Sequence, residues 1–287
     1  MTIDPFVTHR NLLFTVAYEM LGSAADAEDV VQESWLRWAE VDQDDVEYPR
    51  AYLVQMVTRQ ALNRMRTLSR RREEYVGEWL PEPLLTSPDV AEHVELAENV
   101  SIAMLTVLET LGPTERAVFV LRDVFDTPYD EIAMAVGKNP AAVRQIARRA
   151  REHVAARRPR MQVTAAEQQA VVAQFLDALA TGNVDDLMRV LAPDVVAITD
   201  GGGVTPAARR PIVGAGKLAA LLPLLAQTPG FAATTIWLNG MPGIRVDFDR
   251  GTTAISLVVA DGQITHMYAI NNPHKLGHLA KVVNLRR

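Results

Sequence analysis

Residues 130–151 read DEIAMAVGKNPAAVRQIARRAR and predict a pair of helices joined by a turn. The spacing of their apolar residues predicts a short helix over residues 130–136, a turn at residues 137–140 and a basic helix over residues 141–155. A short helix, a glycine-containing turn and a second helix make the helix-turn-helix pattern. We expect the second helix to bury one row of apolar side chains, made of Val143, Ile146, Ala147 and Ala150.

Arginines lie on another face of this basic helix, since Arg144, Arg148 and Arg151 are spaced four and three residues apart. Such a face can enter the major groove of DNA, and the alternative is a solvated helix face. Residues 138–160 hold seven arginines and one lysine against one glutamate, and residues 59–72 hold six arginines and no acid. Two such blocks indicate phosphate binding. For the arginines from Arg64 to Arg72, the alternative to DNA contact is a basic helix end, which the helix dipole favours.

The net charge of −6 averages over these basic blocks and one strongly acidic block. Residues 19–47 hold ten acidic residues against one arginine, whereas residues 161–287 hold ten basic and nine acidic residues. Residues 161–287 are therefore the part of the chain that we least expect to contact DNA.

The composition is that of a globular protein, with 287 residues of which 48% are hydrophobic and 22% charged. This length suggests about two domains. The chain has no cysteine, and His93, His153 and His278 have no partners at ligand spacing, so we expect no metal site. The N-terminus lacks a signal-peptide pattern, and the longest apolar stretch, residues 218–226, is shorter than the roughly 20 residues of a membrane span. We therefore expect a soluble, cytoplasmic protein without a membrane partner.

Helices are also predicted near the N-terminus. Residues 6–41 have helical spacing, and a helix opens at residues 24–29, where acidic residues fill the first turn. Val31, Trp35 and Trp38 then recur on one face, and we expect both tryptophans in the core rather than stacked on bases. After Pro49 a further helix carries an apolar row at helical spacing, made of Leu53, Met56, Val57, Ala61 and Met65.

Residues 75–88 cannot form a continuous helix, because prolines fall at positions 81, 83 and 88. This segment is predicted to be an extended linker. It carries the apolar side chains of Tyr75, Trp79, Leu80 and Leu84, which a fully solvated tether would avoid. We expect the linker to dock on another part of the chain.

After residue 160 the pattern changes. Residues 164–167 resemble a capping box ahead of a helix that ends near residue 182, and a second helix is predicted over residues 184–191. Strands are predicted over residues 195–199, 232–238, 244–248, 252–259 and 264–270, with turns at Gly251 and Asp261-Gly262. Helices followed by an antiparallel meander are typical of an α+β fold.

Residues 26–35, DAEDVVQESW, resemble the polymerase-binding segment of the sigma-2 domain in extracytoplasmic-function (ECF) sigma factors of RNA polymerase. Residues 49–66 resemble the next segment of that family, which recognises the −10 promoter element. Residues 111–151 resemble the sigma-4 domain, whose helix-turn-helix reads the −35 element. These motifs occur in the family's order and together cover residues 6–158.

The resemblance assigns roles residue by residue. Contacts with core RNA polymerase fall on Asp29, Gln32 and Glu33, in an acidic segment suited to a basic partner. Contacts with the −10 element of promoter DNA fall on Arg59, Asn63 and Arg66. Contacts with the −35 element fall on Asn139, Ala142, Arg144, Gln145, Arg148, Arg149 and Arg151.

Three further stretches resemble signatures of one ECF subgroup, whose members carry a fused C-terminal SnoaL-like domain with the cone fold of ketosteroid isomerase. They are YVGEWLPEP at residues 75–83, DGGG at 200–203 and NNPHKL at 271–276. The resemblance implies a multidomain fold of two all-α sigma domains and an α+β cone domain. The implied parts are sigma-2 at 1–72, a linker at 73–91, sigma-4 at 92–159 and the SnoaL-like domain at 160–287.

In this subgroup the C-terminal domain takes the place of a separate anti-sigma protein, packs against the linker and the sigma domains, and regulates activity in cis. The implied interdomain contacts fall on Trp79, Leu80, Pro81, Glu82, Pro83, Asp200, Gly201, Gly202, Gly203, Asn272, Pro273, Lys275 and Leu276. No cofactor is implied, and a small-molecule ligand of the cone domain is left open.

Two other classes of protein stay open. One is a one-component helix-turn-helix regulator with a ligand-binding cone, and the other is a cone-fold isomerase or hydrolase with an accessory DNA module. A catalytic acid–base pair would come from the ionisable or hydroxyl side chains Asp177, Asp200, Asp247, His266 and Tyr268. We favour a non-catalytic protein, in which Asp200 and its glycines form a tight turn at the sigma interface.

Overall fold

The computed structural model of the protein describes residues 4–72, 75–92, 94–159 and 163–286. The chain divides into two compact units. The N-terminal unit comprises Met1–Glu74, Leu105–Arg158 and Asn284–Arg287, and the C-terminal unit comprises Tyr75–Met104 and Pro159–Val283. Within the described ranges, no helix is both long and apolar enough to cross a membrane.

The first helices of the N-terminal unit begin and end at local signals. Asp4 caps the first helix by accepting a 2.7 Å hydrogen bond from Phe6 N, and Ser23 caps the second by accepting one of 3.1 Å from Asp26 N. A proline begins the third, where a missing N–H is harmless. These elements are α1 (Pro5–Leu21), α2 (Ala24–Trp38), the 3₁₀ turn η1 (Gln43–Asp45) and α3 (Pro49–Arg72).

The apolar row predicted after Pro49 forms the buried face of α3, where Leu53, Val57 and Ala61 are fully buried. Of the two tryptophans on α2, Trp38 lies in the core as predicted. The prediction for Trp35 was wrong, because its side chain is 38% exposed and packs edge-on against Phe6. Residue 35 lies at the border of the buried face, since Ser34 and Trp38 turn inward.

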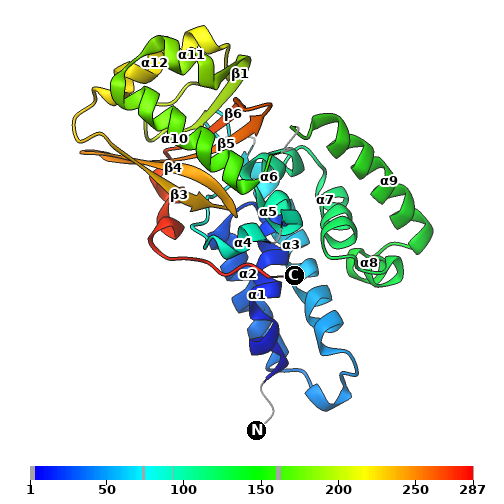
Figure 1. The fold of residues 1–287 in the computed structure, drawn as a ribbon. Helices are drawn as coiled ribbons and strands as arrows, with labels where there is room; N and C mark the ends of the chain where they lie inside the picture. The colour runs from blue at the N-terminus through cyan, green and yellow to red at the C-terminus, as the bar shows by residue number, and fades with distance from the viewer. Residues whose placement is uncertain (1–3, 73–74, 93, 160–162, 287) are drawn as a thin grey trace. The chain divides into compact units, whose positions relative to one another are not determined.

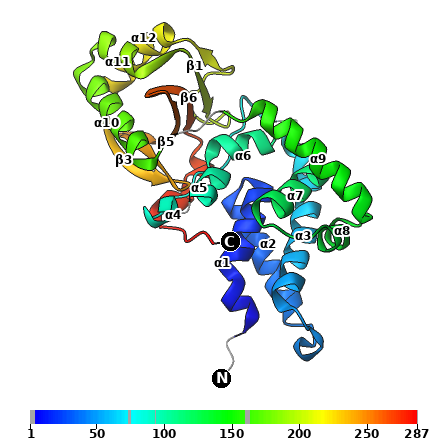
Figure 2. The ribbon, with the colours of Figure 1, turned by 45° about the vertical axis from the view of Figure 1, so that its right-hand side comes forward.

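The second half of the N-terminal unit is the helical pair predicted from the sequence, preceded by two shorter elements (Figure 2). Its inward side chains Val143, Ile146, Ala147 and Ala150 are all buried. Asn139 caps the second helix of the pair through a 2.8 Å bond from Ala142 N. The elements are α7 (Pro113–Phe119), the π-helical turn η2 (Val120–Val124), α8 (Tyr129–Val136) and α9 (Pro140–Arg157).

The C-terminal unit contains a six-stranded sheet in the order β2-β1-β6-β5-β4-β3. Strands β3 to β6 form the predicted antiparallel meander, whereas β1 pairs in parallel with β6. The strands are β1 (Leu191–Asp200), β2 (Ile212–Val213), β3 (Ala232–Leu238), β4 (Met241–Phe248), β5 (Gly251–Ala260) and β6 (Gln263–Ile270).

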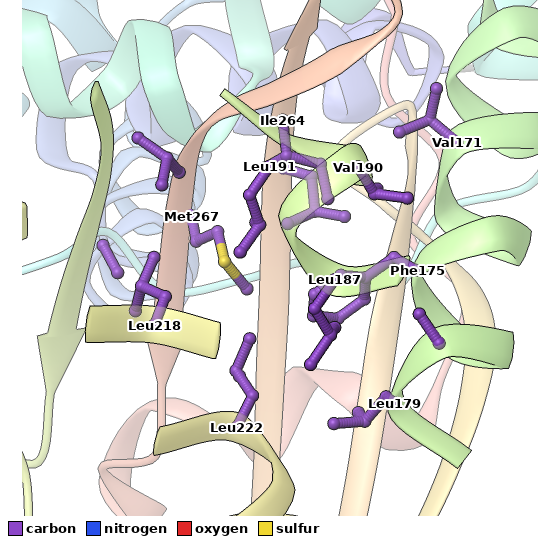
Figure 3. Packing of buried hydrophobic residues seen from close by; sticks show 14 of the residues in the cluster. Val171, Phe175, Leu179, Leu187, Val190, Leu191, Leu218, Leu222, Ile264 and Met267 are labelled. Carbon is purple, nitrogen blue, oxygen red and sulfur yellow. The ribbon is translucent and has the colours of Figure 1, made fainter. Parts of the chain in front are cut away.

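Helices α10 (Ala165–Thr181), α11 (Val184–Val190) and α12 (Ala215–Ala226) pack against this sheet (Figure 1). Thr164 and Glu167 form the predicted capping box at the start of α10. The sequence did not predict α12 or the short β2. Phe175, Leu187, Leu218 and Met267 meet in the core between helices and sheet, which Figure 3 shows filled by apolar side chains.

Residues 75–104 belong to the C-terminal unit, although they precede its sheet by about a hundred residues. Residues 75–88 are extended, as the prolines predict. They lead into the short helices α4 (Asp89–Glu92), α5 (Val94–Val100) and α6 (Ile102–Leu108), and the division between the units falls inside α6. The 3₁₀ turns η3 (Pro273–Lys275) and η4 (Gly277–Ala280) follow β6, and residues 281–286 continue without helix or strand.

Candidate functional site

The carboxylate of Asp200, at the end of β1, is fully buried and organises the docking of the linker. It accepts hydrogen bonds from Tyr75 Oη at 2.6 Å and from the backbone N–H of Leu80 at 2.8 Å. It also accepts one from Gly202 N at 3.0 Å and one from Lys275 Nζ at 2.7 Å. Two linker residues and two residues of the C-terminal domain therefore converge on one buried charge.

Lys275 balances this charge and contacts the linker at three further points. Its Nζ donates a 2.5 Å hydrogen bond to the Leu80 carbonyl, and it lies 4.0 Å from the ring centre of Trp79 and 4.9 Å from that of Tyr75. A cation over an aromatic face is attracted by the ring quadrupole, more strongly where water is excluded. Lys275 is 7% exposed, so this environment is nearly dry.

Tyr75 acts as a donor in the cluster. Burial, reinforced by the nearby Asp200 carboxylate, raises the pKa of its phenol well above the usual range, so the hydroxyl keeps its proton. The same oxygen accepts a 2.8 Å hydrogen bond from Asn272 Nδ2. Tyr75 was not among the site residues that the sequence singled out, although it begins the linker motif.

The glycines after Asp200 are required by the close approach of other chain segments. Gly202 has φ +60°, and a Cβ there would lie 2.2 Å from Asn272 Nδ2. Gly203 has φ +72°, and a Cβ there would lie 3.1 Å from the Val76 Cβ. A side chain at either position would push away the linker or the residue-272 segment. The tight turn predicted at Asp200 therefore forms part of the docking surface.

The rest of the predicted regulatory residues gather around this cluster. Leu80 is fully buried in an apolar group with Ile102, Val258 and Tyr268, against which Leu276 packs. Pro81, Glu82 and Pro83 are buried, and Pro273 begins η3 at the surface. The structure thus brings all three predicted motifs together within one unit, and their regulatory role stays a prediction.

The residues expected to read a −35 element lie on α9 and at its N-cap, away from the buried face of the helix. Arg149 and Gln145 are exposed, and Arg148 pairs with Glu152 one turn further on. Arg144 lies 5.7 Å from the ring centre of Tyr129. Asn139 is the helix cap, and Ala142 donates its backbone N–H to that cap.

Arg151 differs from the other arginines of this surface. Its Nε donates a 2.5 Å hydrogen bond to Asp123, and its Nη2 lies 3.4 Å from Tyr129 Oη. The hydrogen bond to Asp123, followed by that to Tyr129, raises the pKa of Arg151. Asp123 and Tyr129 went unnoticed in the sequence, because only the fold brings them to the arginine face of α9.

The residues expected at the −10 element lie on the exposed face of α3. Arg59 Nη2 donates a 3.0 Å hydrogen bond to the carbonyl of Met134 in α8, and Arg66 Nη1 lies 3.4 Å from Asn63 Oδ1. Asn63 and Arg66 are otherwise exposed. The side chains of Arg70, Arg71 and Arg72, in the same basic block, lie outside the described residues.

The residues expected to contact polymerase share the exposed face of α2. Asp29, Gln32 and Glu33 are all exposed. Asp29 pairs with Arg64 of α3 at 2.8 Å, and Arg64 also bonds Asp26, so part of the acidic charge is balanced within the unit. Glu28, one turn before Gln32, is exposed as well.

The five side chains considered for acid–base catalysis do not form one site, and among them His266 and Tyr268 contact each other. Asp177 is exposed on α10, Asp200 belongs to the linker cluster, and Asp247 bonds Arg245 and Thr252. His266 stacks on Tyr268, on the face of β6 that is opposite to Met267 and the helices. Burial lowers the pKa of His266.

Three histidines were considered in the sequence as metal ligands. His93 lies outside the described residues, His153 contacts Thr110, and His278 lies 4.0 Å from Glu82.

Comparisons with known proteins identify the class. The family model of sigma-70 region 2 matches residues 6–71, and that of sigma-70 region 4 matches residues 101–154. The ECF RNA polymerase sigma factor SigJ of Mycobacterium tuberculosis is 36% identical to this chain. The alignment, gaps included, spans 296 residues and covers 96% of this chain and 93% of SigJ. The chain belongs to the ECF family of RNA polymerase sigma factors.

One further relative and one solved structure agree with this assignment. The probable ECF sigma factor SigI of Mycobacterium tuberculosis is 30% identical over 276 residues, covering 94% of this chain and 93% of SigI. The crystal structure of Mycobacterium tuberculosis SigJ matches with a TM-score of 0.78 and 34% identity, over 96% of this chain and 98% of that one. The match includes the C-terminal α+β domain, so this chain combines sigma-2 and sigma-4 domains with a SnoaL-like domain, as the motifs predicted.

Proposed function

We propose that this protein binds core RNA polymerase, directs it to promoters with −10 and −35 elements, and is regulated in cis by its C-terminal domain. The observation that carries the regulatory part is the buried Asp200–Lys275 pair, which holds linker residues 75–80 on that domain. The linker lies in sequence between the two domains that read DNA. A domain that holds or releases it biases how those domains can be spaced on a promoter.

Regulation of this kind requires two states that differ in free energy. Holding the linker buries Leu80 and Leu84 and satisfies the Asp200 charge, whereas release exposes them to water. A partner shifts the equilibrium only if it binds one state better than the other. Polymerase and promoter DNA, which need the sigma domains at a set spacing, are the natural candidates for that differential binding.

The contact with polymerase is supported by the composition of the α2 surface. Gln32 lies in a groove between α1 and α2 together with Val7 and Trp35, which are 58% and 38% exposed. Glu33 adjoins this groove on the same helix. The groove is also lined by Glu28 and Arg10, so it joins apolar side chains to charges of both signs. With Glu33 on the next position of α2, its α2 side suits a partner helix that carries apolar and basic side chains.

Glu33→Lys is expected to weaken binding of core polymerase roughly tenfold at low salt, because it replaces an attractive charge by a repulsive one. Glu40→Lys is the matched control, since it makes the same charge change at an exposed position beyond the end of α2. Fluorescence anisotropy with labelled protein and core polymerase measures the difference. Equal losses in the two variants would show that only the overall charge matters.

Arg144→Ala is expected to weaken promoter binding by ~1–3 kcal/mol and to relax preference at one position of the −35 element. Arg149→Ala is expected to weaken binding equally for all sequences and to reduce the salt slope by about one, as for a phosphate contact. Band-shift titrations of holoenzyme on single-position promoter variants separate the two. A uniform loss for Arg144→Ala would make it a phosphate contact, and no loss would remove its role.

Run-off transcription tests the proposal as a whole. Wild-type protein is expected to bind core polymerase and give promoter-specific transcript, and Lys275→Met at equal holoenzyme concentration is expected to give a different amount. Failure of the wild type to bind core would exclude sigma activity. Equal transcript from both proteins would leave sigma activity standing and show that the Asp200–Lys275 pair does not regulate it. We assign the protein no catalytic activity of its own and place it with polymerase in the cytoplasm.

A further inference from the structure

The turn between β3 and β4, at Asn239-Gly240, has a hairpin geometry that occurs twice in the C-terminal domain. Its φ angles are +52° and +77°, and those of the turn at Asp261-Gly262 are +52° and +74°. Asn-Gly and Asp-Gly are typical of two-residue hairpin loops, because both positions need positive φ. The two turns differ in burial, since Asn239 is fully buried whereas Asp261 is exposed.

Asn239 is buried because linker residues cover it. Its Oδ1 accepts a 2.8 Å hydrogen bond from Leu84 N, and its own N–H donates a 2.9 Å bond to the Leu84 carbonyl. Its Nδ2 donates a 2.8 Å bond to the carbonyl of Val100, at the end of α5. One side chain thus bonds two linker-side segments that lie sixteen residues apart.

The neighbouring backbone extends this contact. Gly240 N donates a 2.9 Å bond to Thr86 Oγ1, and Thr86 N donates a 3.0 Å bond to the Trp237 carbonyl. Leu85 forms a β-bridge with Leu238. Residues 84–86 therefore run as an added strand along the end of β3.

Gly240 also allows α5 to approach the turn. A Cβ on Gly240 would lie 2.9 Å from the Ala97 Cβ and 2.9 Å from Val90 Cγ1, closer than side chains tolerate. At Gly262 the same Cβ would meet nothing within 4 Å. The glycine at 240 thus serves both the turn and the packing of α5, whereas the glycine at 262 serves only the turn.

We infer that the β3–β4 turn is a second docking site for the linker, in which Asn239 is the positioning residue that holds Leu84 together with Val100 at the end of α5. This inference rests on the proposed regulation in cis, because it names a further residue of that device. The Asp200 cluster holds residues 75–80, and the turn holds the chain from Leu84 onward. Loss of one site leaves the other, so full release requires both to open.

Asn239→Gly in the full-length protein tests this directly. Glycine keeps the positive φ of the turn and removes both side-chain hydrogen bonds. Hydrogen exchange is expected to become at least tenfold faster at Leu84 and Thr86, while the Leu80 amide, bound by Asp200, stays protected. Asp261→Gly is the matched control and is expected to change nothing in residues 84–100. Gly240→Ala and Gly262→Ala form a second matched pair. Both place alanine at a positive φ, but only the methyl group at position 240 would clash with α5, so only Gly240→Ala is expected to disturb its packing.

Three results would overturn the inference. Exchange in residues 84–90 could be the same in Asn239→Gly as in Asp261→Gly. Exchange could rise equally throughout the β-sheet, in which case Asn239 only stabilises the fold. The Leu80 amide could lose its protection together with Leu84, in which case the linker has a single docking site.

Transcription separates this inference from the regulatory proposal. Faster exchange at Leu84 with unchanged transcription would leave the second docking site standing, because the Asp200 site still holds residues 75–80. Regulation through the linker is tested by combining Asn239→Gly with Lys275→Met, which opens both sites, and unchanged transcription from that double variant would remove it.

Discussion

Replacing Lys275 with methionine is expected to destabilise the docking of the linker by about 3–5 kcal/mol. Methionine retains much of the apolar stem but removes the ammonium, which bonds Asp200 at 2.7 Å and the Leu80 carbonyl at 2.5 Å. The Asp200 carboxylate would stay fully buried without a cation to balance it. Removing one partner of a buried ion pair is more damaging than removing both, because the remaining charge is left without compensation.

The protein can relieve this penalty by releasing residues 75–80, which lets water reach Asp200. The measured loss of docking free energy therefore cannot exceed the free energy needed to release residues 75–80. The backbone N–H of Leu80 donates a 2.8 Å hydrogen bond to Asp200, so hydrogen exchange at this amide reports the release directly. We expect exchange there to become roughly 100-fold faster or more, as a loss of about 3 kcal/mol implies.

Two variants control this experiment. Arg245→Met removes an ion pair with Asp247 whose side chains are 39% and 40% exposed, so it is expected to change stability by less than about 1 kcal/mol. Combining Asp200→Asn with Lys275→Met removes both charges and is expected to recover much of the loss. If Lys275→Met behaved like Arg245→Met, the buried pair would not be what holds the linker.

Replacing Arg116 with methionine is expected to destabilise the N-terminal unit by about 3–5 kcal/mol. Arg116 lies on α7 and is 2% exposed. Its Nε donates a 3.0 Å hydrogen bond to the backbone carbonyl of Glu19 in α1, and its Nη1 pairs with Glu109. Burial lowers the pKa of Arg116 to about 9, against the opposing effect of Glu19, so the side chain is still cationic at neutral pH. Its loss removes the cation that balances Glu109, whose side chain is 13% exposed.

The two units must be followed separately in this measurement. Trp35 and Trp38 lie in one unit and Trp79 and Trp237 in the other, so tryptophan fluorescence reports on both. Hydrogen exchange of peptides from α1 and α7 reports on the N-terminal unit alone. Arg122→Met is the control, since Arg122 pairs with Asp126, whose side chain is 89% exposed. A loss no larger than that of Arg122→Met would contradict the importance of the buried pair.

The helix-turn-helix was predictable because its signals are local. Helices expected over residues 130–136 and 141–155 occur as Tyr129–Val136 and Pro140–Arg157. Apolar spacing, a glycine in the turn and an asparagine cap all fall within about twenty residues, so each can be read without the rest of the fold. The same holds for α10, whose capping box at Thr164 and Glu167 is complete within four residues.

Helix α12 was missed because its local signals conflict. Gly216 and Pro223 lie inside the helix, and both argue against a helix of this length. Burial of Leu218, Ala219 and Leu222 against the sheet outweighs those preferences. The parallel pairing of β1 with β6 was also missed, because it joins residues about seventy positions apart.

The docking site of the linker was likewise predictable only in part from the sequence. The motifs at residues 75–83, 200–203 and 271–276 were recognisable, yet Tyr75 was not singled out as a site residue. The Asn239-Gly240 pair was overlooked as well, although Asn-Gly between two strands is a strong hairpin signal. No spacing in the sequence indicates that this turn receives Leu84, because the two lie 155 residues apart.

The sequence by itself determined most of the helices and strands, the segregation of charge and the order of the sigma motifs, because these depend on residues that are neighbours along the chain. Only the tertiary structure decided that Asp200, Lys275 and Tyr75 share one buried site, and that Asp123 and Tyr129 hold Arg151. The physical reason is that a buried charge is stable only where its partners meet it in space. Asp200 finds those partners 125 residues before it and 75 residues after it.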